Sequence, residues 1–152
     1  MQDADSLIVF TLDNQRYALP MQAADRVVRI VAISSLPKAP DIVLGVVNIQ
    51  GRVIPVVNMR RRFSLPEREF ALSDQLLVAH TATRPVALIA DEVLDVMKST
   101  ARNLVSAEKI LPATEYVAGV VKLEDGLIFI HDLDRFLSLE EGAVLDSALE
   151  PG

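Results

Sequence analysis

The chain has 152 residues, of which 51% are hydrophobic, and a formal net charge of −6 at pH 7. No apolar run approaches the roughly 18–20 residues that cross a bilayer, and the acidic N-terminus lacks the basic start of a secretory signal. The absence of cysteine excludes disulfides, thiolate catalysis and cysteine-based zinc sites. We therefore expect a cytoplasmic protein without direct membrane insertion.

The first predicted elements are strands. Residues 6–12 and 16–21 are short apolar runs around the turn-forming residues 13–15, and they predict a hairpin. Residues 25–33 alternate enough for a further strand, which the two prolines of 34–40 end.

A second hairpin is expected around Gln50 and Gly51, where glycine can supply the positive φ of a tight turn. Before it, residues 41–45 fit a single helical turn or bend. Pro55 lacks an N–H, which favours an edge strand or a bulge at that point. Residues 60–74 are polar and form the predicted boundary between two halves.

The second half repeats this order of elements. Residues 75–81 and 84–93 predict a hairpin, residues 100–116 a helix or loop, and residues 117–133 another hairpin around the turn 124–126.

The tail predicts a short helix. Ser138 and Glu141 have the spacing of a capping box, and Val144, Leu145 and Leu149 are expected to share one face.

An internal repeat links the halves. Residues 45–63 align without gaps with 119–137, and residues 7–28 align with 76–97. Lobes of this size have marginal cores by themselves. We therefore expect two similar small β-barrels that share an interface, with strands exchanged between them.

The chain offers little catalytic chemistry. His131, Asp132 and Asp134 form a cluster that could hold a metal or an acid–base site, although a structural turn is the simpler interpretation. Paired acids also occur within 91–93 and 123–125, where a solubilising role is the simpler interpretation. Phosphate-binding glycine motifs are absent. The only basic cluster, residues 60–62, reads as a solvated face, and there are few aromatic residues, so nucleic acid is not an expected partner. A binding module remains, with no enzymatic activity, cofactor or metal expected, and the apolar composition leaves open whether apolar patches are exposed.

Four segments in order resemble the CheW family over roughly residues 6–139. They are "LIVFTLDNQRYALPMQAADRVVRI", "LPKAPDIVLGVVNIQGRVIPVVNMRRRF", "VALIADEVLDVMK" and "EYVAGVVKLEDGLIFIHDLDRFL". The resemblance implies a mainly β fold of two SH3-like five-stranded barrels, with short helices in the connectors and the tail. It implies one domain over 6–139, with subdomains of about 6–65 and 75–139 and a tail at 140–152.

The resemblance also implies a non-enzymatic adaptor. CheW proteins couple the hairpin tips of methyl-accepting chemoreceptors to the regulatory domain of the histidine kinase CheA, so recruitment to membrane-associated receptor arrays is expected. The receptor helices bind between the barrels and the kinase binds barrel ends. The expected receptor-side residues are Ala24, Arg26, Val28, Gly45, Asn48, Gln50 and Arg52. The expected kinase-side residues are Val86, Leu88, Asp91 and Val93.

Two departures from the family pattern involve three positions. Gln50 stands where the family motif carries arginine, and Arg26 aligns with its usual acidic neighbour. Asn58 stands where the family often has Asp, whereas Asp132 keeps the equivalent place in the second repeat. An exposed ion pair contributes only about 0–1 kcal/mol, so we expect its loss to change specificity and leave the fold intact.

Two alternatives stay open. The chain could be a scaffold that binds kinase-type partners without receptor coupling, or a small metal-dependent enzyme built around His131, Asp132 and Asp134.

Overall fold

The computed structural model describes residues 4–63, 65–69, 71–100, 104–106, 117–135 and 139–149. Within these residues no helix is long and apolar enough to cross a membrane. The strands are β1 (Ala4–Leu12), β2 (Gln15–Pro20), β3 (Ala24–Arg29), β4 (Val43–Ile49), β5 (Arg52–Val57), β6 (Gln75–His80), β7 (Pro85–Ala90), β8 (Glu92–Thr100), β9 (Leu104–Ser106), β10 (Val117–Leu123) and β11 (Gly126–His131). The helical segments are η1 (Met21–Ala23), α1 (Met59–Arg62), η2 (Leu133–Arg135) and α3 (Leu139–Leu149).

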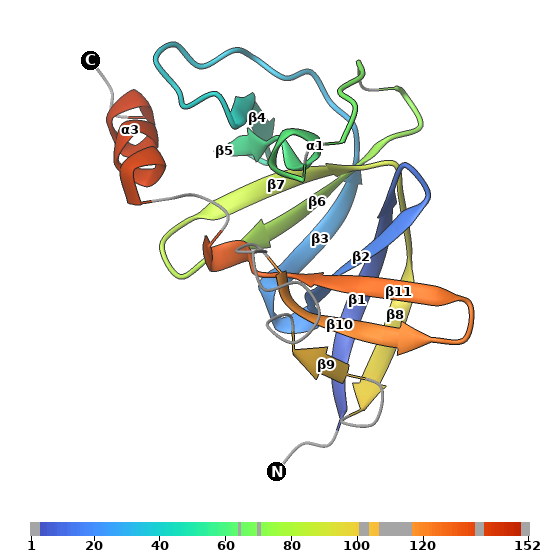
Figure 1. Ribbon diagram of the computed structural model, residues 1–152. Helices are drawn as coiled ribbons and strands as arrows, with labels where there is room; N and C mark the ends of the chain where they lie inside the picture. Colours follow the sequence, from blue (N-terminus) through green and yellow to red (C-terminus); the bar gives the residue numbers. More distant parts are fainter. Residues whose placement is uncertain are drawn as a thin grey trace.

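The described strands form two sheets (Figure 1). One has the order β8-β1-β2-β11-β10-β9 and the other the order β3-β6-β7-β5-β4. We call them sheet 1 and sheet 2. The predicted mainly β fold with a few short helices is confirmed, and sheet 1 adds the short β9 outside its five longer strands.

The pairing register confirms the repeat. Both β4-β5 and β10-β11 are antiparallel hairpins that contain an irregularity before their first glycine. Gly45 lies opposite Val56, and the equivalent Gly119 lies opposite Ile130. Equivalent residues of the two halves therefore occupy equivalent places in the two sheets.

Each sheet takes strands from both repeats. Sheet 1 joins the first hairpin, β1-β2, to β8, β10 and β11 from the second half, and sheet 2 joins β6-β7 to β3, β4 and β5 from the first half. The joins are the antiparallel pairs β1·β8 and β3·β6 and the parallel pairs β2·β11 and β5·β7. The sequence limits 6–65 and 75–139 stay a prediction for the subdomains.

Among the described residues this arrangement gives three larger apolar cores and a small cluster around Val120. Along β1, Leu7 and Val9 belong to the core of sheet 1, whereas Ile8, Phe10 and Leu12 belong to a larger core that both sheets share. In β6, Leu76 lies in the core of sheet 2 and Leu77 in the shared core. Strands buried on both faces read as continuous apolar runs, because neither face needs polar residues. The shared core accounts for much of the apolar composition.

Of the two forms predicted for residues 41–45, the structure has the tight bend: Val43 N donates a hydrogen bond to Pro40 O at 2.9 Å, and β4 begins at Val43. Ile42 and Val43 are buried in the shared core. The edge strand or bulge expected at Pro55 is wrong. Pro55 lies in β5, which is an interior strand between β4 and β7. The proline is tolerated there because the parallel ladder to β7 comprises only Val56 and Val57, after the proline.

The connectors and the tail also differ in part. Helix α1 lies inside the predicted polar boundary, and the Asn58 side chain caps it by accepting a hydrogen bond from Arg61 N at 3.0 Å. The predicted helix or loop at 100–116 contains β9, and its other residues from 101 to 116 lie outside the described residues.

The tail helix is confirmed as α3. Leu145 is buried and Leu149 packs beside it on the shared core, but Val144 is 41% exposed and does not share their face. The expected cap at Ser138 lies outside the described residues.

Candidate partner-binding surfaces

Strand β8 is an outer strand of sheet 1, and strand β3 is an outer strand of sheet 2. The Val93 backbone N–H, near the start of β8, donates a hydrogen bond to Gln75 Oε1 at 2.8 Å. Gln75 pairs in register with Arg29, at the end of β3. The end of β3 therefore meets the start of β8 across Gln75.

Exposed apolar side chains extend the shared core toward these two strands. Directly opposite residues of antiparallel strands project on the same face of a sheet. Val27 lies opposite Leu77, and Val96 lies opposite Ile8, and both partners belong to the shared core. Val27 and Val96 remain 37% and 47% exposed. We call Val27, Arg29, Val96 and Lys98, with the half-buried Ala24 and Val93, the edge surface.

The predicted receptor-side residues of β3 lie on two faces. Ala24 packs against the shared core, whereas Val28 packs against the core of sheet 2. Arg26 is exposed and lies opposite Val78 of that same core, so it projects on the face away from the edge surface.

The other predicted receptor-side residues lie in the β4-β5 hairpin. Gln50 and Gly51 have φ of 52° and 85°, which confirms the predicted tight turn. Asn48 Oδ1 accepts a hydrogen bond from Gly51 N at 2.9 Å and so fixes the turn. Gln50 and Arg52 are exposed, whereas Gly45 is buried. No hydrogen bond joins Gln50 to Arg26 in the described part of the chain.

The predicted kinase-side residues are not one surface. Val86 and Leu88 are only 2% and 0% exposed, because their side chains lie in the shared core. Asp91 is occupied by ion pairs, and Val93 packs at the edge surface. We therefore leave Val86 and Leu88 out of the proposed partner surfaces.

An ion-pair network holds the segment 65–74 against the two sheets. Arg60 binds Asp13 at 2.7 Å and Asp91 at 2.8 Å, and Arg68 binds Asp91 at 2.6 Å and Asp74 at 2.9 Å. Burial opposes ionisation of Asp91, but the Asp13 N–H and the guanidinium groups of Arg60 and Arg68 hold its pKa below the usual value. Hydrogen bonds to Asp74 are the main cause that raises the pKa of Arg68.

This network corrects the reading of residues 60–62 as a solvated face. Arg60 also donates to Pro66 O at 3.0 Å, and Arg62 binds Glu141 of α3 at 2.5 Å. The side chains of Arg60 and Arg62 are only 11% and 14% exposed. No local pattern shows this, because the carboxylates that bind Arg60 and Arg62 lie far away along the chain.

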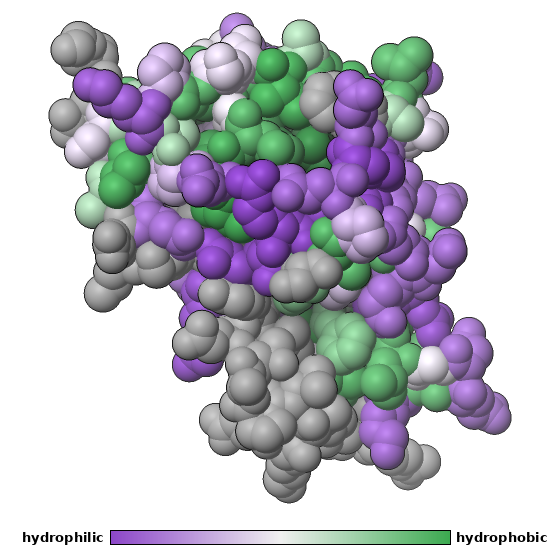
Figure 2. All heavy atoms as spheres, turned by 45° about the horizontal axis from the view of Figure 1, so that its top comes forward, coloured by the Kyte–Doolittle hydropathy of each residue, from purple (hydrophilic) through white to green (hydrophobic). Residues whose placement is uncertain are grey.

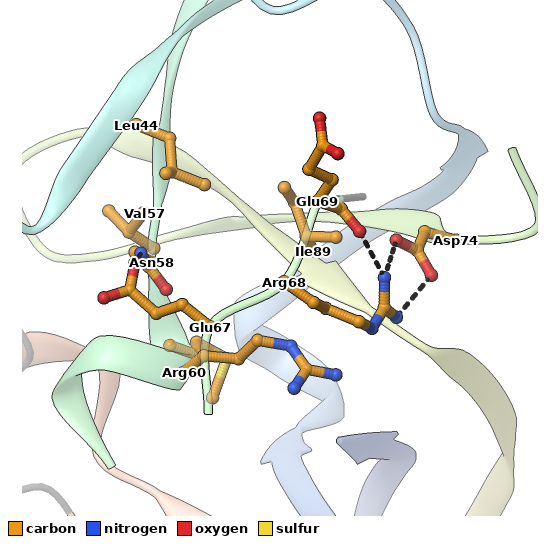
Figure 3. A pocket seen from close by; sticks show the side chains of 10 residues that line it. Leu44, Val57, Asn58, Arg60, Glu67, Arg68, Glu69, Asp74 and Ile89 are labelled. Carbon is orange, nitrogen blue, oxygen red and sulfur yellow. Dashed lines mark hydrogen bonds and ion pairs between the residues drawn. The ribbon is translucent and has the colours of Figure 1, made fainter. Parts of the chain in front are cut away.

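A pocket of about 470 Å³ opens beside this network (Figure 3). Apolar side chains and charged side chains both line it: Leu44, Val57, Asn58, Met59, Arg60, Glu67, Arg68, Glu69, Asp74 and Ile89. In the space-filling view that brings this part of the molecule forward, hydrophobic atoms are exposed beside a band of hydrophilic ones (Figure 2). Leu44 and Val53, on β4 and β5, are 39% and 59% exposed. Sequence reasoning did not select either residue.

The cluster around His131 has structural contacts. His131 is buried and packs edge-on against Phe63, with ring centroids 5.3 Å apart. Burial, followed by the charge of Arg62, lowers the pKa of His131 to about 3. Asp134 accepts a hydrogen bond from Ala82 N at 2.8 Å, and Asp132 pairs with Arg135 at 3.5 Å. No group of three potential metal ligands occurs in the described part of the chain.

Comparison with known proteins gives a consistent result. The family model of the CheW-like domain matches residues 6–141. The chain is 27% identical to the chemotaxis protein CheW of Bacillus subtilis, over 97% of both chains, and 26% identical to CheW of Klebsiella aerogenes, over 92% of this chain and 86% of that protein. It is also 27% identical to protein FrzA of Myxococcus xanthus, over 74% of this chain and 71% of that one. The crystal structure of the scaffolding protein TtCheW from Thermoanaerobacter tengcongensis has a similar fold, with a TM-score of 0.81, 24% identity, and coverage of 90% of this chain and 94% of the other.

Proposed function

The chain belongs to the CheW-like family of scaffold proteins, and from this membership we propose that it couples chemoreceptors to a CheA-type histidine kinase. It acts as an adaptor in chemosensory signalling, and its contribution is binding and placement of partners. The observation that carries the proposal is that the apolar core shared by the two sheets reaches the surface at Val27 and Val96, on two adjacent outer strands.

The edge surface is the proposed receptor site. Exposed apolar side chains at the junction of two sheets suit an amphipathic helix, which can lay its apolar stripe against them. The hairpin tip of a methyl-accepting chemoreceptor supplies helices of this kind. Arg26, Gln50 and Arg52 are exposed beyond this surface and are the proposed determinants of which receptor binds.

The side of sheet 2 formed by β5 and β4, which carries Leu44 and Val53, is the proposed kinase site. Among the strand residues whose exposure is described, Val53 is the most exposed aliphatic side chain. The pocket at the other end of the β4-β5 hairpin offers further apolar surface through Leu44, Val57 and Ile89. The regulatory domain of a CheA-type kinase has the same fold and can present an equivalent strand end. Because the two sites are separate, the receptor and the kinase can bind at the same time, which coupling requires. Binding to the receptor recruits the chain to receptor arrays.

Calorimetric titration with each partner tests these assignments. A Val27→Asp/Val96→Asp variant should lose binding of a receptor hairpin-tip fragment and keep binding of the kinase regulatory domain. A Val53→Asp variant should show the opposite pattern and serves as the matched control. Binding of neither partner by the native chain would refute the proposal, and binding of the kinase alone would indicate a scaffold without receptor coupling.

The departure at Gln50 gives a second test. Gln50→Arg restores the residue that the family carries at this turn. Gln50 is exposed and belongs to none of the three larger apolar cores. It should change the affinity for the receptor fragment more than the affinity for the kinase domain. An equal effect on both would contradict the assignment of this turn to the receptor side.

A further inference from the structure

Most arginines in the described part of the chain are neutralised by carboxylates. Those that form ion pairs are Arg16, Arg60, Arg61, Arg62, Arg68, Arg84 and Arg135. Arg26, Arg29 and Arg52 form neither an ion pair nor a hydrogen bond within that part, and the same is true of Lys98. Arg29 and Lys98 both belong to the edge surface.

The two cations of the edge surface lie on the same face as its valines. Arg29 lies opposite Gln75 and Lys98 lies opposite Ser6, each two residues beyond the exposed valine of its strand. The repeat relates Val27 to Val96, and Arg29 and Lys98 each follow directly after the aligned residues 7–28 and 76–97. The structure therefore presents the same pair, a valine followed by a cation, once on each outer strand.

The two cations lie at opposite ends of the edge surface. The end of β3 meets the start of β8, so Arg29 lies near Val93, whereas Lys98 lies further along β8. Residues 93–98 of an extended strand cover about 16 Å, which equals about three turns of an α-helix. A helix that lies along the valines would therefore meet a positive charge near each end of the contact.

The acidic residues of the same strands do not cancel these charges. Asp25 binds His80 at 2.9 Å. Asp95 lies opposite Val9 and Glu92 opposite Thr11, so both project on the face away from the shared core. The positive charge of the edge surface thus remains available to a partner.

We propose that the edge surface selects an amphipathic helix whose apolar stripe carries a carboxylate at each end, about three turns apart. This inference rests on the proposed receptor site and specifies the chemistry of the helix that occupies it. Because the whole chain carries a net charge of −6, an acidic partner is repelled at long range. Attraction therefore requires carboxylates that lie opposite Arg29 and Lys98. This requirement determines where along the edge surface the helix binds, as well as how tightly it binds.

Two synthetic helical peptides test the proposal. They share one apolar stripe and differ only at its ends, with glutamate in one peptide and lysine in the other, eleven residues apart as the roughly three-turn separation requires. Fluorescence anisotropy with the full chain should show at least tenfold tighter binding of the glutamate peptide at low salt, and added salt should reduce the difference. Equal binding of the two peptides would overturn the inference.

Matched variants locate the effect. Arg29→Glu/Lys98→Glu should reverse the preference between the peptides, whereas Lys122→Glu, on the exposed face of β10 and away from the edge surface, should preserve it. Circular dichroism shows whether each variant is folded. A preference that survives reversal of Arg29 and Lys98 would also overturn the inference.

The same variants separate this inference from the proposed function. Loss of receptor-fragment binding in Val27→Asp/Val96→Asp, together with an unchanged peptide preference in Arg29→Glu/Lys98→Glu, would refute the charge selection and leave the receptor site standing. Unchanged receptor-fragment binding in the valine variant, together with a reversed peptide preference, would refute the receptor site and support the charge selection.

Discussion

At the scale of single residues, His131 makes the free energy of unfolding depend on pH. Its pKa is lowered to about 3 by burial and by Arg62, against about 6.5 in an unfolded chain. Between these values the unfolded chain binds a proton that the folded chain does not, so stability falls as the pH falls from 6.5 toward 3. The contribution is fully present above pH 6.5.

Replacement of His131 by a residue that does not titrate should therefore flatten the stability profile. When the pH is lowered from 6.5 to 4.5, the free energy of unfolding of His131→Leu and of His131→Asn should fall by about 2 kcal/mol less than that of the native chain. The full effect of one such titration is about 1.4 kcal/mol per pH unit. Urea unfolding at the two pH values measures this. The two variants differ in packing and polarity, so a shared change identifies the titration, and a native slope in both would contradict it.

Gly45 is required by a close approach of two backbone segments. A Cβ atom there would lie 2.3 Å from Ser34 O, beside the hydrogen bonds that join Ser34 to Val46 at 2.8 and 2.9 Å. Gly45→Ala should lower the free energy of unfolding by about 1–3 kcal/mol, because backbone must move. Gly142→Ala is the control, since nothing lies within 4 Å and the helix should gain about 0.5–1 kcal/mol. Equal thermal stability of the two variants would refute this account.

At the scale of elements, ion pairs hold the segment 65–74 in place. Arg60→Met removes the contacts to Asp13, Asp91 and Pro66 O together. We expect faster cleavage after Glu67 and Glu69 by a glutamate-specific protease, with peptide mapping as the readout. Arg61→Met is the control, because Arg61 is 44% exposed and its pair with Glu67 is solvated. Similar cleavage rates in both variants would show that Arg60 does not secure the segment.

Helix α3 packs on the shared core through Leu145, the one fully buried side chain among the helix residues whose exposure is described. Leu145 is fully buried in the shared core, whereas its neighbour Val144 is 41% exposed. Leu145→Ala should lower the free energy of unfolding by about 2–5 kcal/mol, and Val144→Ala should change it by less than about 0.5 kcal/mol. Urea unfolding of both variants checks this, and a small effect at Leu145 would mean that α3 is not anchored there.

Features that depend on neighbouring residues could be predicted from the sequence, whereas features that depend on residues far apart along the chain could not. The hairpins were predictable because their turns depend on local residues such as Gln50 and Gly51, whose φ values are positive. The start of β4 and the burial of Val86 and Leu88 could not be predicted, because a core shared by two sheets buries both faces of a strand. Such a strand lacks the alternation of apolar and polar residues that marks its buried face. The partners of Arg60 lie 47 and 31 residues away, so no local pattern shows them.

At the scale of the whole molecule, the two halves of the chain need each other. Within the first half only the pairs β1·β2 and β4·β5 are intact, and β3 pairs with β6 of the second half. The parallel joins β2·β11 and β5·β7 also connect one half to the other. The first half alone therefore keeps only isolated hairpins, which are marginally stable in water. The second half alone keeps the hairpin β6-β7 and the short run β9-β10-β11, without the strands of the first half that complete each sheet.

Division of the chain between Leu72 and Ser73 tests this dependence. Leu72 is 94% exposed, so the cut lies outside the apolar cores. Each fragment alone should give a collapsed amide NMR spectrum, and an equimolar mixture should recover a dispersed one, because the cross-half strand pairs and the shared core re-form. The intact chain cut at this site by a protease is the control and should remain folded. A dispersed spectrum from either fragment alone would mean that a half can close its own barrel, and would contradict an obligatory exchange of strands.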